Sequence, residues 1–295
     1  MKVSKSHISI EGGVIGSVRI FCDKEEAGFP VVYVNGGPGG TYLDDHHGIR
    51  DLAAGRDVVL YDQLGSYHSP AQFDMSLTPM PRFVAELKHV LDAHGLEKAI
   101  VLGHSFGGTI AVDFALTHPQ LVAGLILSSP LLSTPRWIED ANALLRQLPP
   151  KEQAVIAARL RGEAVEAADY DAAEKMVYGR HLCRIDPWPA RLLEGFSKGN
   201  KEIYQAMWGL SEFTCTGTLK DYDCFPRLHE LRMPVMLVCG RYDEATPETI
   251  GDAAAKIPDA EFIVMENASH CPLYEDREAY LAAISFFAAK VDAKG

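Results

Sequence analysis

One serine of the chain has the neighbours that can make a hydroxyl group nucleophilic. Ser105 lies in the segment GHSFG at 103–107, which matches the pattern G-x-S-x-G. The serine of this pattern occupies a strained turn, and glycine is needed two residues before and after it because side chains there would collide. An apolar run at 99–102 precedes the segment and a helical run at 109–116 follows it. This strand–turn–helix order predicts that Ser105 is the nucleophile of an acyl transfer.

An acid and a base with suitable placement follow later in the chain. Asp243 comes directly after an apolar run at 235–239, and His270 comes after one at 262–265. In serine hydrolases the histidine takes the serine proton, while the aspartate fixes the imidazole tautomer and stabilises the imidazolium. The carboxyl ends of parallel strands meet at one edge of a sheet. We therefore predict that Ser105, Asp243 and His270 converge at that edge as a catalytic triad.

A second glycine-rich segment, NGGPGG at 35–40, follows the apolar run 31–34. Acyl transfer creates a negatively charged oxygen, which main-chain N–H groups can stabilise at such a junction, together with the N–H of the residue after the nucleophile. Gly37 and Phe106 are the predicted donors of this oxyanion hole. A purely structural turn is the alternative interpretation of 35–40.

Other histidines compete for the role of base. His104 adjoins the nucleophile and is expected to pack into the sheet. The run DDHH at 44–47 resembles a metal-binding cluster. However, consecutive side chains point in different directions, and no further ligand follows at a suitable spacing. His270 is therefore the predicted base, and we expect neither a metal ion nor an organic cofactor.

The elements that must position these residues alternate between strands and helices. A helix is predicted over 79–94, with Thr78 as its N-cap and Gly95 just beyond its end, and a last helix over about 277–290. Strands are predicted at 18–22, 31–34, 58–61, 100–102, 124–127, 235–238 and 262–265. This alternation is typical of a mostly parallel sheet flanked by helices on both faces, an α/β fold.

The alternation stops between about 131 and 229. This segment is rich in Ala, Leu, Glu and Arg and is interrupted by prolines, so it predicts several helices. Because strands resume after it, we interpret it as an insertion. The predicted organisation is a core domain made of 1–130 and 230–295, with a helical cap domain, or lid, at 131–229.

The composition indicates an ordinary globular protein without nucleic-acid or membrane partners. Hydrophobic residues make up 47%, charged residues 23%, and the net charge is −12. Such a charge repels a phosphate backbone on average, and no stripe of Lys and Arg offsets it. No run is long and apolar enough to cross a bilayer, and the first residues lack the apolar centre of a signal peptide. The six scattered cysteines are expected to be reduced, which makes the cytoplasm the expected location.

Together, the motifs resemble those of the proline iminopeptidase family (prolyl aminopeptidases), serine peptidases of the α/β-hydrolase fold. NGGPG at 35–39 is similar to the family's HGGPG, and DQLGSYHS at 62–69 is similar to DQxGxGxS. GRYDEATP at 240–247 is similar to GxxDxxTP. MWGLSEF at 207–213 and GTLKD at 217–221 are similar to the family's cap-domain signature. The resemblance covers nearly the full length and implies an α/β-hydrolase fold with an inserted helical cap.

The resemblance implies release of an N-terminal residue, often proline, from short peptides or amino-acid amides through an acyl-enzyme. In the family, glutamates of the cap and beside the catalytic aspartate hold the free amine of the substrate; the matching positions are Glu212 and Glu244. A buried ammonium needs such carboxylate partners. Two positions depart from the family pattern: Asn35 replaces a histidine and Tyr67 replaces a glycine. Both lie in loops near the oxyanion hole, so the preferred N-terminal residue stays open between proline and other small or hydrophobic residues.

Two other functions remain open on the sequence alone. The fold hosts many chemistries, so the chain could be an esterase, lactonase or thioesterase. Such an enzyme needs no amine-binding carboxylates, and Glu212 and Glu244 therefore favour the peptidase. A non-catalytic receptor on the same scaffold is the third hypothesis, and the complete set of Ser105, Asp243 and His270 argues against it. The pair Asp62-Gln63 is interpreted as a structural clamp.

Overall fold

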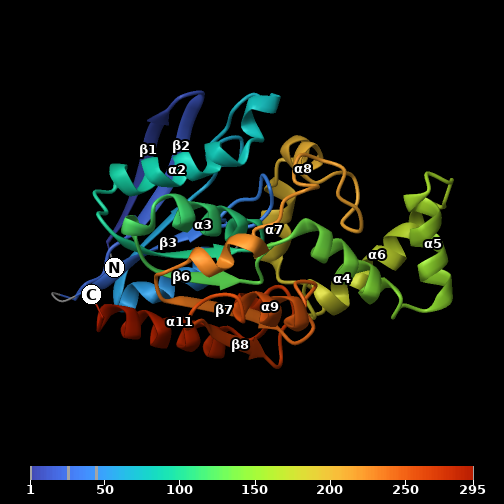
Figure 1. Cartoon of the computed structure of the whole chain (residues 1–295). Coiled ribbons are helices and arrows are strands. Elements are labelled where there is room, and N and C mark those ends of the chain that lie inside the picture. Colours follow the sequence, from blue (N-terminus) through green and yellow to red (C-terminus); the bar gives the residue numbers. More distant parts are fainter. Residues whose placement is uncertain (1, 25–26, 44–45, 295) are drawn as a thin grey trace.

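The strands form one eight-stranded sheet in the order β1-β2-β4-β3-β5-β6-β7-β8. The sheet lies in the left and central part of Figure 1. The computed structural model describes residues 2–24, 27–43 and 46–294. β2 runs antiparallel to both of its neighbours, and all the other pairs are parallel. The strands are β1 (Val3–Ile10), β2 (Gly13–Ile20), β3 (Gly28–Val34), β4 (Arg56–Tyr61), β5 (Ala99–His104), β6 (Val122–Ser128), β7 (Val235–Gly240) and β8 (Glu261–Met265).

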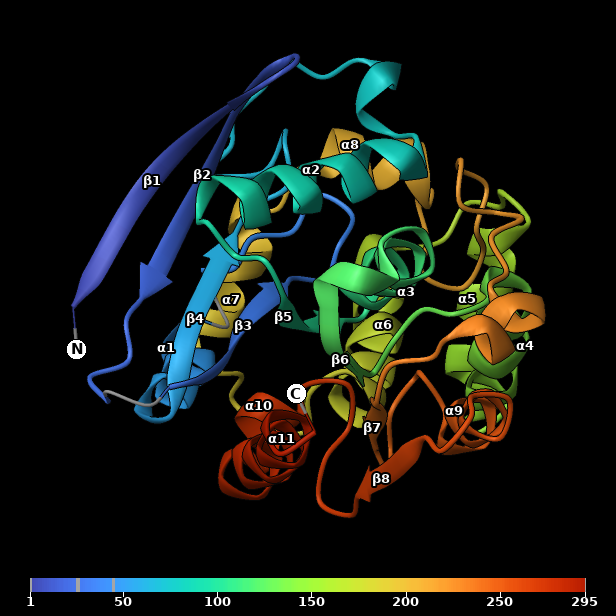
Figure 2. The same ribbon diagram turned by 60° about the vertical axis from the view of Figure 1, so that its left-hand side comes forward.

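Helices cover both faces of the sheet, as Figure 2 shows. One face is covered by the helices α2 (Met80–Ala93), α3 (Phe106–Thr117) and α9 (Pro247–Ala254). The other face is covered by α1 (His46–Ile49) and α11 (Arg277–Asp292). Successive side chains of a strand point to opposite faces. Val32 and Val34 accordingly belong to the hydrophobic cluster under α2 and α3, whereas Val31 and Tyr33 belong to the cluster under α11. The predicted architecture of a mostly parallel sheet between two layers of helices is confirmed.

Local expectations differ from the structure in two places. β1 was not expected, because its residues are mostly exposed and lack a buried apolar run. Thr78 is not the N-cap of α2: Pro79 occupies that position without a capping side chain, and the Thr78 hydroxyl donates to the carbonyl of Met75 at 2.9 Å. The expectation for Gly95 is confirmed, because it follows the C-cap with a φ of 63°.

Five helices lie between β6 and β7, beyond the carboxyl ends of the parallel strands (Figure 1). They are α4 (Thr134–Leu145), α5 (Pro150–Leu160), α6 (Ala167–His181), α7 (Ala190–Lys198) and α8 (Lys201–Met207). α4, α5 and α6 share a small hydrophobic cluster of their own. In contrast, Ile203, Met207 and the segment from Leu219 to Leu228 contribute to the main cluster on the α3 face of the sheet. The helices α4 to α6 therefore protrude from the core domain, while the end of the insertion packs in the main hydrophobic core.

The remaining sequence features agree with a protein stabilised by its apolar core. None of the six cysteines forms a disulfide bond, and four of them are buried as small apolar side chains. The longest helix, α11, has 16 residues. Within the described ranges, no helix combines the length and the apolar character needed to span a membrane.

Candidate active site

Ser105 lies on a strained turn between β5 and α3. Its φ of 54° is in the left-handed region that residues other than glycine rarely adopt. A Cβ atom on Gly103 would lie 2.3 Å from the Gly107 carbonyl oxygen, and one on Gly107 would lie 2.0 Å from the Val34 oxygen. Glycine at both positions therefore lets these main-chain segments approach each other more closely than a side chain would allow. The turn places Ser105 on the wall of a cavity at the N-terminus of α3, where the helix dipole favours negative charge.

The predicted oxyanion-hole donors belong to segments that touch Ser105. A Cβ atom on Gly36 would lie 3.0 Å from the Ser105 Cβ, so the loop that contains Gly37 runs against Ser105. Gly37 has a φ of 120° and lines the same cavity as Ser105. Phe106 is the first residue of α3, so its N–H has no acceptor within the helix. Its ring is fully buried and packs edge-on against Phe83, which holds this first turn in place.

His270 and Asp243 are in direct contact. The His270 Nδ1 lies 2.8 Å from the Asp243 Oδ1, and the two side chains are 6% and 0% exposed. Asp243 also accepts the main-chain N–H groups of Ala245, at 2.8 Å, and of Gly240, at 3.2 Å. Because a carboxylate accepts, Nδ1 carries the hydrogen and Nε2 remains available. His270 lines the same cavity as Ser105, so the structure brings all three predicted residues to one site.

Glu212 and Glu244 also lie in this cavity. The Glu244 Oε1 is 3.8 Å from the His270 Nε2, on the opposite side of the ring from Asp243. Glu212 follows α8 in the insertion and accepts a short hydrogen bond from the hydroxyl of Tyr204. The Trp137 ring stands edge-on to the His270 ring, with 5.8 Å between centroids. Two carboxylates and an aromatic wall therefore surround the imidazole.

The charges of this site are unbalanced. Burial is the main cause that raises the pKa of both Glu212 and Glu244 above their usual range. Burial lowers the pKa of His270, but the nearby charges of Asp243, Glu244 and Glu212 outweigh it and raise that pKa to about 9. Within the described part of the chain, neither glutamate forms an ion pair with a lysine or arginine. The site therefore favours a positively charged ligand.

The cavity has a volume of about 440 Å³. Near the two glutamates it is lined by Tyr178 and Tyr204. Its wall also includes the apolar side chains Trp188, Leu192, Phe196, Trp208 and Pro272. Much of this wall belongs to the insertion. Ligand pockets of proteins span about 300–1,000 Å³, so this cavity suits a small molecule or a short peptide rather than a folded chain.

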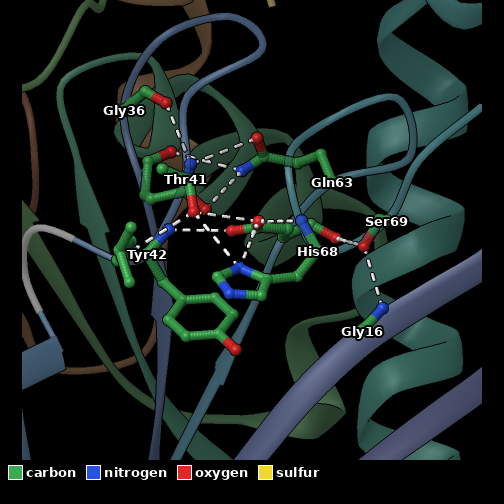
Figure 3. A network of polar contacts seen from close by, with 10 residues as sticks. Gly16, Gly36, Thr41, Tyr42, Gln63, His68 and Ser69 are labelled. Atoms are coloured by element: carbon green, nitrogen blue, oxygen red, sulfur yellow. Dashed lines mark hydrogen bonds and ion pairs between the residues drawn. The ribbon is translucent and has the colours of Figure 1, made fainter. Parts of the chain in front are cut away.

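A buried polar network supports the loop at 35–40, as Figure 3 shows. The Asp62 carboxylate accepts hydrogen bonds from the Thr41 hydroxyl at 2.9 Å, from the Tyr42 N–H at 2.8 Å, and from the N–H and Nδ1 of His68 at 2.8 Å each. Gln63 Nε2 donates to the main-chain and side-chain oxygens of Asn35 at 3.2 Å. Asn35, which replaces the family's histidine, thus keeps a direct link to Gln63. Neither Asp62 nor Gln63 lines the cavity, in agreement with a structural clamp.

The second departure from the family pattern lies at the surface. The Tyr67 side chain is largely exposed, and the Lys198 Nζ at the end of α7 lies 4.9 Å from its ring centroid. Tyr67 also packs edge-on against His68. It does not line the cavity, so it can act on the site only through the loop that carries it.

His104 is largely buried at the end of β5 beside Ser128 of β6, as expected for a packing residue, but it also borders the cavity. Its ring lies 5.0 Å from the His270 ring between centroids. Burial and the proximity of His270 lower the pKa of His104 to about 3, so its imidazole is neutral. The position follows from the geometry of the turn, because the last residue of β5 already stands at the edge of the sheet.

His181, at the end of α6, was not recognised from the sequence. Its carbonyl accepts the N–H of His270 at 3.1 Å, and its Nδ1 donates to the carbonyl of Tyr242 at 2.9 Å. His181 therefore contacts both the loop that carries His270 and the loop that carries Asp243, and it holds them in position. Its Nε2 is buried without a hydrogen-bond partner. No local sequence signal marks these contacts.

We expect His181→Leu to lower kcat by roughly ten- to a hundredfold, because small displacements of catalytic groups have effects of this size. His181→Asn should retain most of the activity, since its amide can replace the Nδ1–H donor to Tyr242. Both variants can be measured with an aminoacyl arylamide, and thermal unfolding would check that each is folded. Equal kcat values for the Leu and Asn variants would show that the hydrogen bond to Tyr242 does not matter.

Metal ligation receives no support from the described residues. The side chains of the DDHH run at 44–47 lie outside the described part of the chain. Among the residues that are described, no group of three or more His, Cys, Asp or Glu side chains could hold a metal ion.

Comparisons with known proteins agree with this geometry. A sequence profile of the alpha/beta hydrolase fold matches residues 30–277. The chain is 38% identical over 287 residues to a proline iminopeptidase of Heyndrickxia coagulans, which covers 96% of this chain and 98% of that relative. It is 31% identical over 264 residues to a proline iminopeptidase of Saccharolobus solfataricus, covering 88% and 85% of the two chains. The crystal structure of a proline iminopeptidase of Mycobacterium smegmatis superposes with a TM-score of 0.92 at 28% identity, covering 99% of both chains.

The similarity extends over the sheet and the inserted helices alike, because the matched relatives are covered nearly from end to end. On these grounds the chain belongs to the proline iminopeptidase family of the α/β-hydrolase fold.

Proposed function

We propose that this chain is a serine aminopeptidase that releases an N-terminal proline, or another small or hydrophobic residue, from short peptides or amino-acid amides. The observation that carries the proposal is the pair of buried glutamates beside the catalytic imidazole, with Glu244 at 3.8 Å from the His270 Nε2. An enzyme for neutral esters has no use for two carboxylates in a desolvated pocket, whereas a substrate ammonium needs them.

The proposed reaction proceeds through an acyl-enzyme. Ser105 attacks the carbonyl of the first residue while His270 accepts its proton, and Asp243 stabilises the imidazolium. The N–H groups of Gly37 and Phe106 stabilise the tetrahedral oxyanion. His270 then protonates the leaving amine, and water hydrolyses the ester bond to Ser105. The substrate amine lies between Glu212 and Glu244, which limits the enzyme to free N-termini.

We assign residues 131–229 to a cap domain and residues 1–130 and 230–295 to the core domain. The cap supplies Glu212 and much of the cavity wall. A cavity of about 440 Å³ under such a cap excludes long or folded chains. Six cysteines without a disulfide bond fit a reducing compartment, and we therefore propose the cytoplasm as the location of the reaction.

A substrate panel tests the proposal. The panel consists of the 4-nitroanilides of Pro, Ala, Leu and Phe, their N-acetylated forms and 4-nitrophenyl acetate. We expect hydrolysis of the free-amine anilides and loss of activity on the blocked ones. The order among the first four defines the preferred residue. If the blocked anilides or the simple ester were the better substrates, the chain would be an esterase or an endo-acting amidase instead.

Replacing either glutamate by glutamine should weaken the binding of free-amine substrates. For Glu212→Gln, we expect KM for the favoured anilide to rise by roughly 10- to 100-fold, the size expected for a lost charged hydrogen bond. KM for 4-nitrophenyl acetate should hardly change, because the ester has no amine. Steady-state kinetics on both substrates provides the measurement. A similar rise in KM for both would argue against an amine-binding role.

A further inference from the structure

The His270 ring lies between two carboxylates, one at each nitrogen. Asp243 contacts Nδ1 at 2.8 Å, and Glu244 faces Nε2 at 3.8 Å. The ring is 6% exposed and the Glu244 side chain 14%, so water screens this pair poorly. Nε2 is the atom that must accept the proton of Ser105. A carboxylate placed there stabilises the protonated ring and thus opposes the reaction.

The other groups that face the ring do not offset this effect. Glu212, in the segment after α8, also raises the pKa of His270, and His104 at the end of β5 is neutral. Burial and nearby carboxylates keep the hydroxyls of Tyr178 and Tyr204 protonated, and Trp137 on α4 carries no charge. The one cation on the cavity wall is Lys201 among the described residues, and it is exposed and forms no ion pair with either glutamate.

We propose that Glu244 holds His270 as an imidazolium while the site is empty, and that a substrate ammonium frees the base by taking over this carboxylate. Glu244 thus has a second role, because it makes the base available only when a free amine is present. The inference rests on the proposed aminopeptidase function. It provides a basis for substrate selection other than affinity. When a molecule without an amine enters the cavity, His270 stays protonated and cannot accept the proton of Ser105.

The exchange is balanced in charge and protons. The ammonium brings one positive charge into the site, and the Nε2 proton leaves to bulk water, so the net charge of the site is unchanged. Burial raises the pKa of Glu244 to about 8, which stays below that of His270, so the imidazole is the first of these two groups to take a proton as the pH falls. The pKa of His270, which its carboxylate neighbours raise to about 9, agrees with a protonated ring at neutral pH.

The decisive measurement is the pH dependence of kcat/KM for 4-nitrophenyl acetate, which reports the base of the free enzyme. In the wild type we expect an apparent pKa well above 7. Glu244→Gln should lower it by at least one unit, which increases the fraction of free base at pH 7 about tenfold. The variant should therefore hydrolyse the ester faster than the wild type at pH 7, while it hydrolyses the favoured anilide more slowly. Glu248→Gln, an exposed carboxylate outside the cavity, is the matched control and should behave as the wild type.

Each outcome decides between the two proposals. An unchanged ester profile together with weaker anilide binding would overturn the role of Glu244 on the base but leave the aminopeptidase intact. If both substrates were unaffected, the amine site itself would be misassigned. The protonation state of the His270 ring gives a second readout that needs no turnover. At pH 7, the ¹⁵N NMR signals of this ring in the Ser105→Ala variant should change from those of imidazolium to those of neutral imidazole when L-prolinamide is added to saturation. Binding with the imidazolium signals unchanged would overturn the proposal.

Discussion

Replacing Ser105 with alanine is expected to lower kcat for the favoured anilide by about 10⁴- to 10⁶-fold, the range found when the nucleophile of a serine hydrolase is removed. The strained turn, the two flanking glycines and the start of α3 together present this single hydroxyl to the cavity. Within the described residues, no other serine shares this geometry. The other cavity serine, Ser128, is buried, and its hydroxyl accepts a hydrogen bond from Tyr280 at 2.9 Å.

The variant should still fold and bind. Alanine removes one oxygen atom and leaves Glu212 and Glu244 in place, so L-prolinamide binding should persist while turnover is lost. Activity must be measured in a preparation free of host hydrolases. Turnover at the wild-type level would remove the nucleophile assignment, and simultaneous loss of binding and of the thermal transition would mean that the variant had not folded.

Asp243→Asn should lower kcat by roughly 10⁴-fold, because an amide in this position no longer stabilises the imidazolium and permits the wrong tautomer. The Asp243 Oδ1 accepts both from the His270 Nδ1 and from the Ala245 N–H, each at 2.8 Å. An asparagine oxygen placed there would keep one acceptor, but its NH₂ group would face the Gly240 N–H that now donates to Oδ2. The alternative rotamer would place NH₂ against the ring.

Asp252→Asn provides the matched control for this change. Asp252 lies on α9 close to the active-site loop in sequence, but its side chain is 66% exposed and pairs only with Arg136 at the surface. Such exposed pairs contribute little, so kcat should stay within a factor of two of the wild type. A comparable loss in both variants would point to a general effect on the 240–254 segment rather than to the acid of the triad.

The sequence was informative where local chemistry dictates local geometry. Gly103 and Gly107 are required by backbone crossings that only glycine tolerates, so the turn at Ser105 could be recognised from five residues. Asp243 and His270 follow buried parallel strands, whose carboxyl ends must share an edge of the sheet. The order of elements then suffices to bring distant residues together.

Features that depend on packing between distant segments were missed. His181 reaches the loops of Tyr242 and His270 only because α6 ends above both, and nothing in its neighbours along the chain reveals this. The contact of His104 with the cavity was not predicted, because it depends on where β5 ends relative to the loop of His270. β1 was not predicted, because an exposed edge strand needs no continuous apolar run.

The division of the insertion into a protruding and a core-packed part also limits how this protein can be re-engineered. Ile203, Met207 and Leu228 complete the same apolar layer as α3, so a chimera joined at residues 131 and 229 would leave a hole in the scaffold. Asn200 marks a better junction, because its N–H and amide bind the carbonyls of Gly39 and Gly65. If only the helices before Asn200 were exchanged for those of another protein, the protruding helices would be replaced and the segments that pack in the core would be kept. Evolution of new specificities in this chain is therefore expected to concentrate before residue 200.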